Sequence, residues 1–179
     1  MRAITILPLL LAALLCLGAG DGLMPGRVTR VVDGDTIDVL LASGRIRVRL
    51  QGIDAPEHDQ PGGRDAQRWL QRRLIDHQVQ LEPVSQDRYE RMVAIVHADG
   101  GVVNAELLRA GHAWAYRHYL RRSERDYCDL EAQARSSANG LWAAPSPHAP
   151  WQHRQTQGKG PFTDFTRETA LQCRRSAGR

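Results

Sequence analysis

Residues 36–50 read TIDVLLASGRIRVRL, and this stretch decides the fold class. Its second half alternates strictly between arginine and aliphatic residues from Arg45 to Leu50. Such a period of two is typical of a strand with two different faces. The first half is also rich in aliphatic residues, and Ser43-Gly44 between the halves is a turn sequence. The stretch therefore predicts a β-hairpin.

The sequence on either side of this hairpin adds three strands and three helices. Strands are predicted over residues 28–32, 79–84 and 92–97. A helix is predicted to begin at Gly62-Gly63, because Ala66, Trp69, Leu70 and Leu74 follow at helical spacing. Asn104 and Ser123 are candidate N-caps of a short and a longer helix. Five strands with one helix between the third and the fourth favour a small closed sheet of the OB type.

The two ends of the chain differ in composition from the middle. Residues 1–20 have a charged start, an apolar run over 4–17 and small residues at 18–20, which predicts a signal peptide. The run is too short for a comfortable membrane span. We therefore expect a secreted or periplasmic protein without stable membrane association. A retained signal anchor is one alternative, and a lipoprotein lipidated at Cys16 is another, although Leu15 stands where a small residue is required.

After the signal peptide, residues 26–143 are predicted to form a single domain. Residues 144–179 begin with closely spaced prolines and continue as a polar run, which predicts a C-terminal tail rather than a second domain. Cleavage of the signal peptide removes Cys16 and leaves Cys128 and Cys173. In an oxidising compartment an even pair suggests one disulfide. Two free thiols, or pairing between chains, are the alternatives.

The charge balance favours an anionic partner. The 179 residues include 24 basic and 20 acidic side chains, which gives a net charge of +4. Lys159 is the only lysine, and the planar guanidinium of arginine matches phosphate well. Codon usage in a GC-rich genome would also favour arginine. The apolar fraction of 42% excludes a wholly disordered chain.

Carboxylates and arginines gather at the ends of the predicted strands. Asp33-Gly34-Asp35 lies between the first two strands, and Asp54-Ala55-Pro56-Glu57 follows the third, which ends near Arg49. Arg91 opens the fifth strand. Such a set suits phosphodiester hydrolysis, because hard oxygen ligands hold a divalent cation and arginines neutralise charge in the transition state. Each piece alone also has a plain structural explanation, since Asp-Gly-Asp is a common turn and an arginine face can be solvated.

Taken together, these segments resemble the staphylococcal-nuclease-like (thermonuclease) family. The resemblance rests on residues 32–36, 48–57 and 87–91, which read VDGDT, VRLQGIDAPE and DRYER. Val103-Asn104 and the later Gly140-Leu141-Trp142 continue it in the same order, so that it extends over residues 27–142.

The resemblance implies an α+β, mainly β fold, namely a five-stranded OB-type barrel with three helices. It implies a calcium-dependent nuclease that hydrolyses DNA, RNA or both and leaves 3′-phosphate ends, and we expect a monomer. The alternative is a catalytically inactive OB module that binds single-stranded nucleic acid. The enzyme is favoured because the carboxylates and arginines that an inactive copy would lose are all present: Asp35, Arg49, Asp54, Glu57 and Arg91.

Roles are carried over from the family residue by residue. The resemblance implies that the carboxylates of Asp35 and Asp54, with the backbone carbonyl of Ala55, ligate Ca2+. It implies that Arg49 and Arg91 hold the scissile phosphate.

The resemblance further implies that Glu57 acts on the nucleophilic water, either as general base or as an orienting acceptor. Tyr89 and Tyr116 are implied to contact the substrate. Glu90 departs from the pattern, because the family usually has glycine there. If this position requires a positive φ, glutamate is strained, and its charge beside Arg91 weakens phosphate binding.

Overall fold

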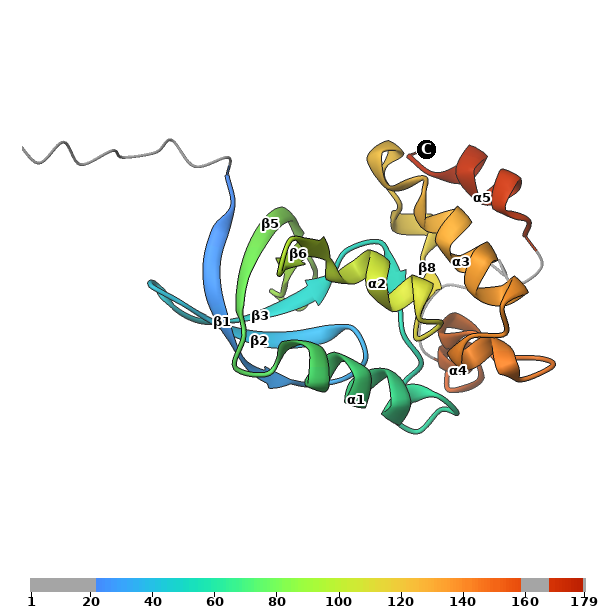
Figure 1. Cartoon of the computed structure of the whole chain (residues 1–179), viewed down its shortest axis with the longest axis horizontal. Helices are drawn as coiled ribbons and strands as arrows, with labels where there is room; N and C mark the ends of the chain where they lie inside the picture. The colour runs from blue at the N-terminus through green and yellow to red at the C-terminus, as the bar shows by residue number, and fades with distance from the viewer. Residues whose placement is uncertain (1–21, 159–167, 179) are drawn as a thin grey trace, which may run out of the picture.

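A computed structural model describes residues 22–158 and 168–178, and the predicted signal peptide lies outside the described residues. In Figure 1 the strands of a barrel lie on one side of the molecule, and helices α3, α4 and α5 lie on the other. Helix α2 lies between these two parts and contacts both β6 and α3.

Five strands form the closed barrel. They are β1 (Met24–Val31), β2 (Thr36–Leu41), β3 (Gly44–Leu50), β5 (Gln78–Gln86) and β6 (Met92–Ala98). Their order is β3-β2-β1-β5-β6 with antiparallel neighbours, and parallel pairing of β3 with β6 closes the barrel. The predicted hairpin is β2–β3, in which Leu41 pairs with Gly44. The five-stranded OB-type barrel is therefore confirmed.

Three short strands complete the sheets. Strand β4 (Ile53–Asp54) pairs with β8 (Trp114–Ala115), and β7 (Gly101–Val102) pairs with the end of β6. The alternation in β3 acts as predicted, because Val48 and Leu50 are buried while Arg45 and Arg47 are exposed.

The described residues contain five helices rather than the three expected. They are α1 (Gly63–Leu74), α2 (Val103–Arg109), α3 (Tyr127–Ser136), α4 (Pro150–Thr156) and α5 (Ala170–Ser176). Helix α1 buries Ala66, Leu70 and Leu74 as predicted, whereas Trp69 is only partly buried.

The two predicted N-caps are wrong. Helix α3 begins at Tyr127, after a separate 3-10 turn that contains Ser123. Asn104 lies within α2, and its side chain is fully buried. It accepts a hydrogen bond from the amide of Val96 and donates one to the carbonyl of Gln51. Asn104 therefore joins β6 to the turn between β3 and β4. The N-cap prediction failed because these tertiary hydrogen bonds outweigh the local capping preference of asparagine.

The segment after residue 144, expected to be a tail, contributes α4 and α5 to the same body. Trp151 of α4 is buried against Trp114 and Trp142 in a second apolar cluster. Cys173 of α5 is fully buried and forms the predicted disulfide with Cys128 of α3, with 5.8 Å between the two Cα atoms. The polar composition of this segment did not predict these contacts. One or two buried side chains are enough to anchor so short a helix, and the rest of its sequence can be polar.

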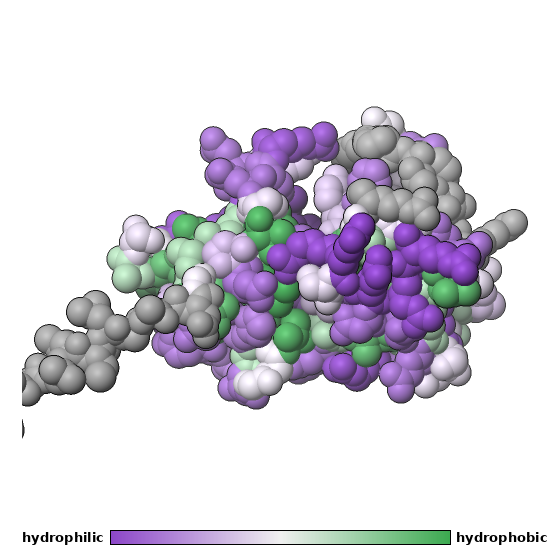
Figure 2. Space-filling view, turned by 90° about the horizontal axis from the view of Figure 1, so that it is seen from above, coloured by the Kyte–Doolittle hydropathy of each residue, from purple (hydrophilic) through white to green (hydrophobic). Residues whose placement is uncertain are grey.

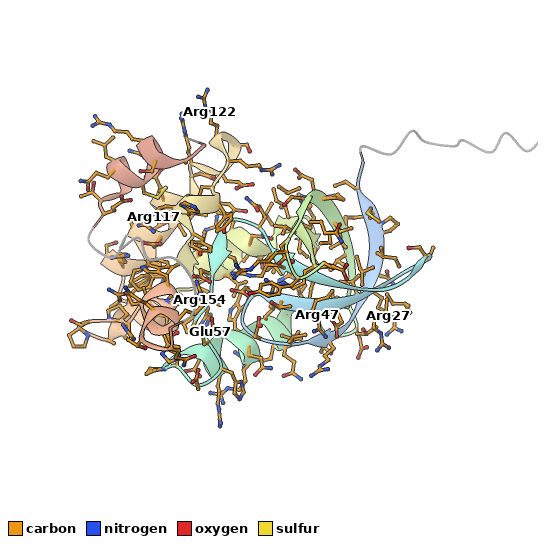
Figure 3. The ribbon with its side chains drawn as sticks, turned by 180° about the vertical axis from the view of Figure 1, so that it is seen from behind. Arg27, Arg47, Glu57, Arg117, Arg122 and Arg154 are labelled. Carbon is orange, nitrogen blue, oxygen red and sulfur yellow. A yellow bond between two sulfur atoms is a disulfide. The ribbon has the colours of Figure 1, made fainter. Side chains whose placement is uncertain are left out.

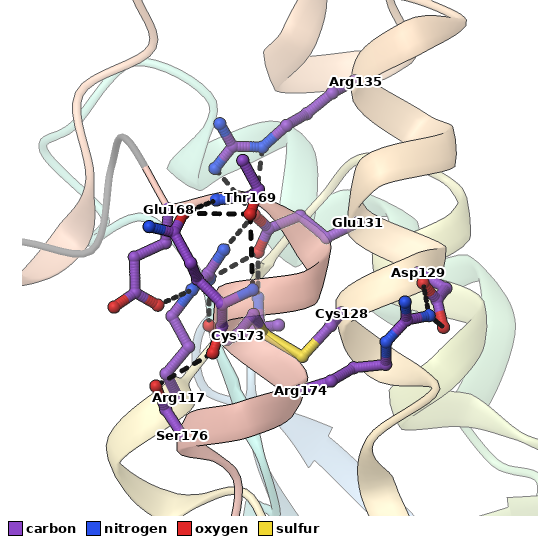
Figure 4. The surroundings of a disulfide bond; sticks show 12 residues. Arg117, Cys128, Asp129, Glu131, Arg135, Glu168, Thr169, Cys173, Arg174 and Ser176 are labelled. Carbon is purple, nitrogen blue, oxygen red and sulfur yellow. Dashed lines mark hydrogen bonds and ion pairs between the residues drawn. A yellow bond between two sulfur atoms is a disulfide. The ribbon is translucent and has the colours of Figure 1, made fainter.

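A buried ionic cluster lies beside the disulfide (Figure 4). The guanidinium of Arg117 lies 2.9 Å from the carboxylate of Glu131 and 3.3 Å from that of Glu168. Arg135 pairs with the same Glu131, and Arg174 of α5 pairs with Asp129 of α3. The pair between Arg117 and Glu168 ties the segment before α5 to the buried Arg117–Glu131 pair, since a buried charge is costly without its partner.

On the face shown in Figure 2, hydrophilic side chains cover most of the surface, and hydrophobic residues form smaller patches between them. No helix in the described ranges has the length and apolar character needed to cross a membrane.

Candidate active site

The loop between β1 and β2 places Asp35 against the end of β4. The side chain of Asp33 accepts a hydrogen bond from the amide of Asp35, which forms a tight local turn. A Cβ on Gly34 would lie 2.6 Å from the Cβ of Ala55, so only glycine permits this close approach. As a result, the carboxylate of Asp35 accepts a 2.7 Å hydrogen bond from the amide of Ala55.

Arg49, at the end of β3, bridges two buried carboxylates. One guanidinium nitrogen lies 3.0 Å from Asp35, and another lies 3.0 Å from Asp54. The side chain of Arg49 is 15% exposed and that of Asp54 is 1% exposed, so water screens these contacts poorly. Arg47, two residues earlier on the same strand, pairs instead with Asp38. The structure therefore brings together three of the predicted site residues.

A second arginine, which the sequence pattern did not indicate, enters the site from α4. One nitrogen of Arg154 lies 2.6 Å from Oδ2 of Asp54, and another lies 2.9 Å from Oε1 of Glu57. Figure 3 shows Arg154 and Glu57 side by side. The only signal for this helix in the sequence was Pro150 at its first turn, followed by Trp151 one helical turn before Arg154. Nothing in the local pattern indicated where that helix would dock.

Burial dominates the electrostatics of the two aspartates. It raises the pKa of Asp35 well above its usual value, although the charge of Arg49 acts in the opposite direction. Burial also raises the pKa of Asp54, and hydrogen bonds from Arg154 and the charge of Arg49 offset only part of this effect. Burial acts to lower the pKa of Arg154, but its bonds to Asp54 and Glu57 outweigh this and raise it. For both aspartates, the cost of burying the charged carboxylate therefore outweighs the favourable effect of the neighbouring arginines.

Replacing Asp35 by asparagine should stabilise the protein when no metal ion is bound. Because the folded state raises the pKa of Asp35, it binds the proton more tightly than the unfolded state does. The wild-type protein should therefore gain stability as the pH falls from neutral toward the usual aspartate pKa of about 4. Asp35→Asn removes the buried charge, and thermal unfolding should show a higher Tm at neutral pH and a weaker pH dependence.

Asp65→Asn, which neutralises an exposed carboxylate on α1, is the matched control for that measurement. Equal Tm values for Asp35→Asn and the wild type at pH 7, in calcium-free buffer, would contradict the expected cost of the Asp35 charge.

The donor chemistry of this site fits a hard divalent cation. The expected ligands are the carboxylates of Asp35 and Asp54 and the carbonyl of Ala55, and all of these are oxygen donors. A cation bound to these oxygens would offset part of the cost of burying the two carboxylates. Among the described residues no group of three or more His, Cys, Asp or Glu side chains is arranged to hold a metal. The expected set contains only two such side chains, so water and substrate would complete the coordination.

Arg91 and Tyr89 form a neighbouring cluster. Arg91 pairs with Asp87 at 2.7 Å, and its guanidinium lies 5.4 Å from the ring centre of Tyr89, which is 63% exposed. Parallel pairing of β3 with β6 sets Arg49 opposite Val93, which brings the start of β6 to the edge of β3. A shallow pocket of about 430 Å³ lies between β1, β2, β3 and residues 89–91, with four arginines among its lining residues: Arg30, Arg45, Arg47 and Arg91.

Glu90 adopts a left-handed backbone conformation with φ of 61°. This position therefore requires the conformation that glycine adopts most readily, and glutamate is strained there.

Tyr116 lies on the α4 side of the site. Its ring is stacked on that of Trp151, with 6.0 Å between the ring centres, and the guanidinium of Arg154 lies 5.9 Å from it. Tyr119 packs against the edge of Tyr116 and is 57% exposed. An aromatic surface therefore borders the carboxylate cluster.

Comparison with known proteins agrees with this geometry. Residues 47–144 match the family described as staphylococcal nuclease homologue. The chain belongs to this family. It is 39% identical over 139 residues to a protein of Shigella flexneri named micrococcal nuclease, covering 73% of this chain and 80% of that protein. It is also 39% identical over 133 residues to an uncharacterized endonuclease of Escherichia coli O157:H7, covering 73% of this chain and 86% of that protein.

The predicted resemblance to the staphylococcal nuclease family is thus confirmed. A further relative, Protein ParB of Escherichia coli, is 37% identical over 139 residues, which cover 73% of this chain and 78% of that protein. The segment that matches the family ends at residue 144, so helix α4 with Arg154 lies beyond it.

Proposed function

We propose that the protein is a secreted, calcium-dependent endonuclease that hydrolyses phosphodiester bonds in DNA or RNA and leaves 3′-phosphate ends. The observation that carries this proposal is the pair of buried carboxylates, Asp35 and Asp54, bridged by Arg49 beside the accessible carboxylate of Glu57. Family membership and relatives named as nucleases support the same reaction class.

The residues divide into a cation-binding side and a phosphate-binding side. Asp35, Asp54 and the carbonyl of Ala55 would hold Ca2+, and the bound ion would polarise a phosphoryl oxygen. Arg49 and Arg91 would donate hydrogen bonds to phosphate oxygens, which strengthen as negative charge accumulates in the transition state.

Glu57 would act on water. Its side chain is 40% exposed, so a water molecule can reach the carboxylate. The carboxylate accepts a proton from the attacking water or orients it, while the water oxygen forms a bond to phosphorus. The bond from phosphorus to O5′ breaks, and the departing oxygen takes up a proton from solvent water. Because the bond to O5′ is the one that breaks, the phosphate remains on the 3′ oxygen.

The disulfide supports the proposed location. Cys128 and Cys173 are buried and bonded, and such a bond persists in an oxidising compartment. A protein exported to the periplasm or to the medium, and acting there as a monomer, is consistent with this bond.

Incubation of the oxidised mature protein with single-stranded DNA and with RNA tests the proposal. Cleavage is expected with Ca2+, should stop when a chelator removes it, and should return when Ca2+ is restored. End-group analysis should find 3′-phosphate. Mg2+ demands a stricter octahedral geometry and should support slower turnover.

Glu57→Gln, which keeps the shape of the side chain, is the matched variant and should depress cleavage while preserving metal binding. Activity that survives complete chelation, or that only Zn2+ restores, would overturn the calcium assignment. Binding without cleavage in the presence of Ca2+ would favour the inactive OB module instead.

A further inference from the structure

Helix α4 is firmly anchored against the body of the protein. Trp151 is 4% exposed and its ring lies edge-on to that of Trp114, with 5.2 Å between the ring centres. The residue before the helix, Ala149, is fully buried. The side chain of Gln60 donates a 2.6 Å hydrogen bond to the carbonyl of His148. These contacts fix the start of α4 beside the segment that carries Glu57.

The anchor determines where Arg154 lies. Arg154 follows Trp151 by three residues, so both side chains extend from the same side of the helix. Its guanidinium donates to both carboxylate oxygens of Asp54, at 2.6 and 3.2 Å, and to Glu57 at 2.9 Å. Charge-assisted bonds of this forked kind fix the orientation as well as the distance of their acceptors. Arg154 therefore holds two carboxylates of the site in one arrangement.

Glu57 depends on this contact. Within the described part of the chain, Arg154 is the partner that the structure gives to the carboxylate of Glu57. The backbone of Glu57 is fixed separately, by hydrogen bonds with Gln60. Without Arg154 the glutamate backbone would stay in place, but its carboxylate would sample several rotamers.

We propose that Arg154 is a positioning residue that aligns Glu57 with Asp54, so that helix α4 completes the active site. This rests on the proposed function, in which Glu57 acts on the attacking water. A carboxylate that is already oriented needs no further ordering when the substrate binds. The region after the family-matched segment thus contributes to catalysis and is more than a C-terminal extension.

The first test is a comparison of steady-state kinetics. Arg154→Ala should lower kcat by about 10–100-fold, the usual cost of losing a partner of a ligating carboxylate, and leave KM within about threefold. Added guanidinium ions, at concentrations that leave the fold intact, should restore part of the lost rate. His153→Gln is the matched control, because His153 lies on the same helix and pairs with Asp59, outside the carboxylate cluster.

A second readout does not depend on activity. In NMR spectra of the calcium-free protein, the guanidinium of Arg154 should give a resolved, slowly exchanging signal. This signal should shift and broaden in Glu57→Gln and stay unchanged in Asp65→Asn. Thermal unfolding of every variant shows whether the fold is retained.

Each outcome decides the proposal. A shifted NMR signal with a lowered kcat supports it. If the wild type cleaves and Arg154→Ala retains its kcat, or gains activity at lower Ca2+, Arg154 does not position Glu57, although the proposed function stands. If the Arg154 signal is the same in Glu57→Gln as in the wild type, Arg154 does not hold the carboxylate of Glu57. If the wild type binds Ca2+ and cleaves neither DNA nor RNA, the proposed function fails and Arg154 is only a structural clamp.

Discussion

Arg91→Ala and Arg49→Ala should each lower the rate of phosphodiester cleavage by about 10²–10³-fold, the usual cost of losing one donor to a developing oxyanion. Binding of the nucleic acid should fall much less, because a contact that tightens only in the transition state contributes little to ground-state affinity. Cleavage under saturating substrate and direct binding in calcium-free buffer measure the two quantities separately.

Arg68→Ala is the control, since Arg68 lies on the exposed face of α1 and pairs with the neighbouring Asp65. A groove arginine that only follows the nucleic-acid backbone would change affinity and reduce the salt dependence of binding by about one counterion. Similar, modest losses of activity in Arg91→Ala and Arg68→Ala would show that Arg91 has no catalytic role.

Removal of the disulfide should lower the free energy of unfolding more than any other substitution proposed for this protein. The bond joins residues 45 positions apart, and closing such a loop stabilises the folded state by about 4 kcal/mol in the chain-entropy model. For a chain of this size each kcal/mol corresponds to about 2–4 °C, so the double variant Cys128→Ala/Cys173→Ala should unfold about 8–16 °C below the wild type. Scanning calorimetry of both proteins under the same buffer conditions gives this difference.

Arg174→Ala provides the comparison, because it breaks the exposed ion pair between α5 and Asp129 and leaves the disulfide intact. Exposed pairs contribute about 0–1 kcal/mol, so this variant should unfold close to the wild type. A double cysteine variant as stable as Arg174→Ala would mean that packing of α5, rather than the covalent link, holds the C-terminal region.

The strands of the barrel were predictable because each one is marked by the hydrophobic pattern of its own residues. The alternation in residues 45–50 and the Ser43-Gly44 turn define β2–β3, and the remaining strands are aliphatic runs of ordinary length. Closure of the barrel depends on the parallel pairing of β3 with β6, which no local pattern reveals. The number and order of the predicted elements favoured a closed sheet of the OB type, and the resemblance to a known family supported closure.

Residues whose partners are distant in sequence were predicted poorly. Asn104 resembles an N-cap locally, yet its amide group donates to the carbonyls of Gln51 and Ala94 and accepts from the amide of Val96. Asp35, Arg49 and Asp54 were expected in one site and are in contact there. Arg154 is separated from Asp54 by 100 residues and lies in a polar segment with prolines, so neither spacing nor composition pointed to it.

The wide separation of these residues also bears on how the protein refolds. Arg49 comes from the third strand, Arg91 from the turn just before the sixth, and Arg154 from a helix near the end of the chain. Contacts between such distant segments form late, since each must overcome the entropy of closing a long loop. Recovery of enzymatic activity after denaturation should therefore lag behind recovery of β-sheet circular dichroism, which makes activity a kinetic marker for the final docking step.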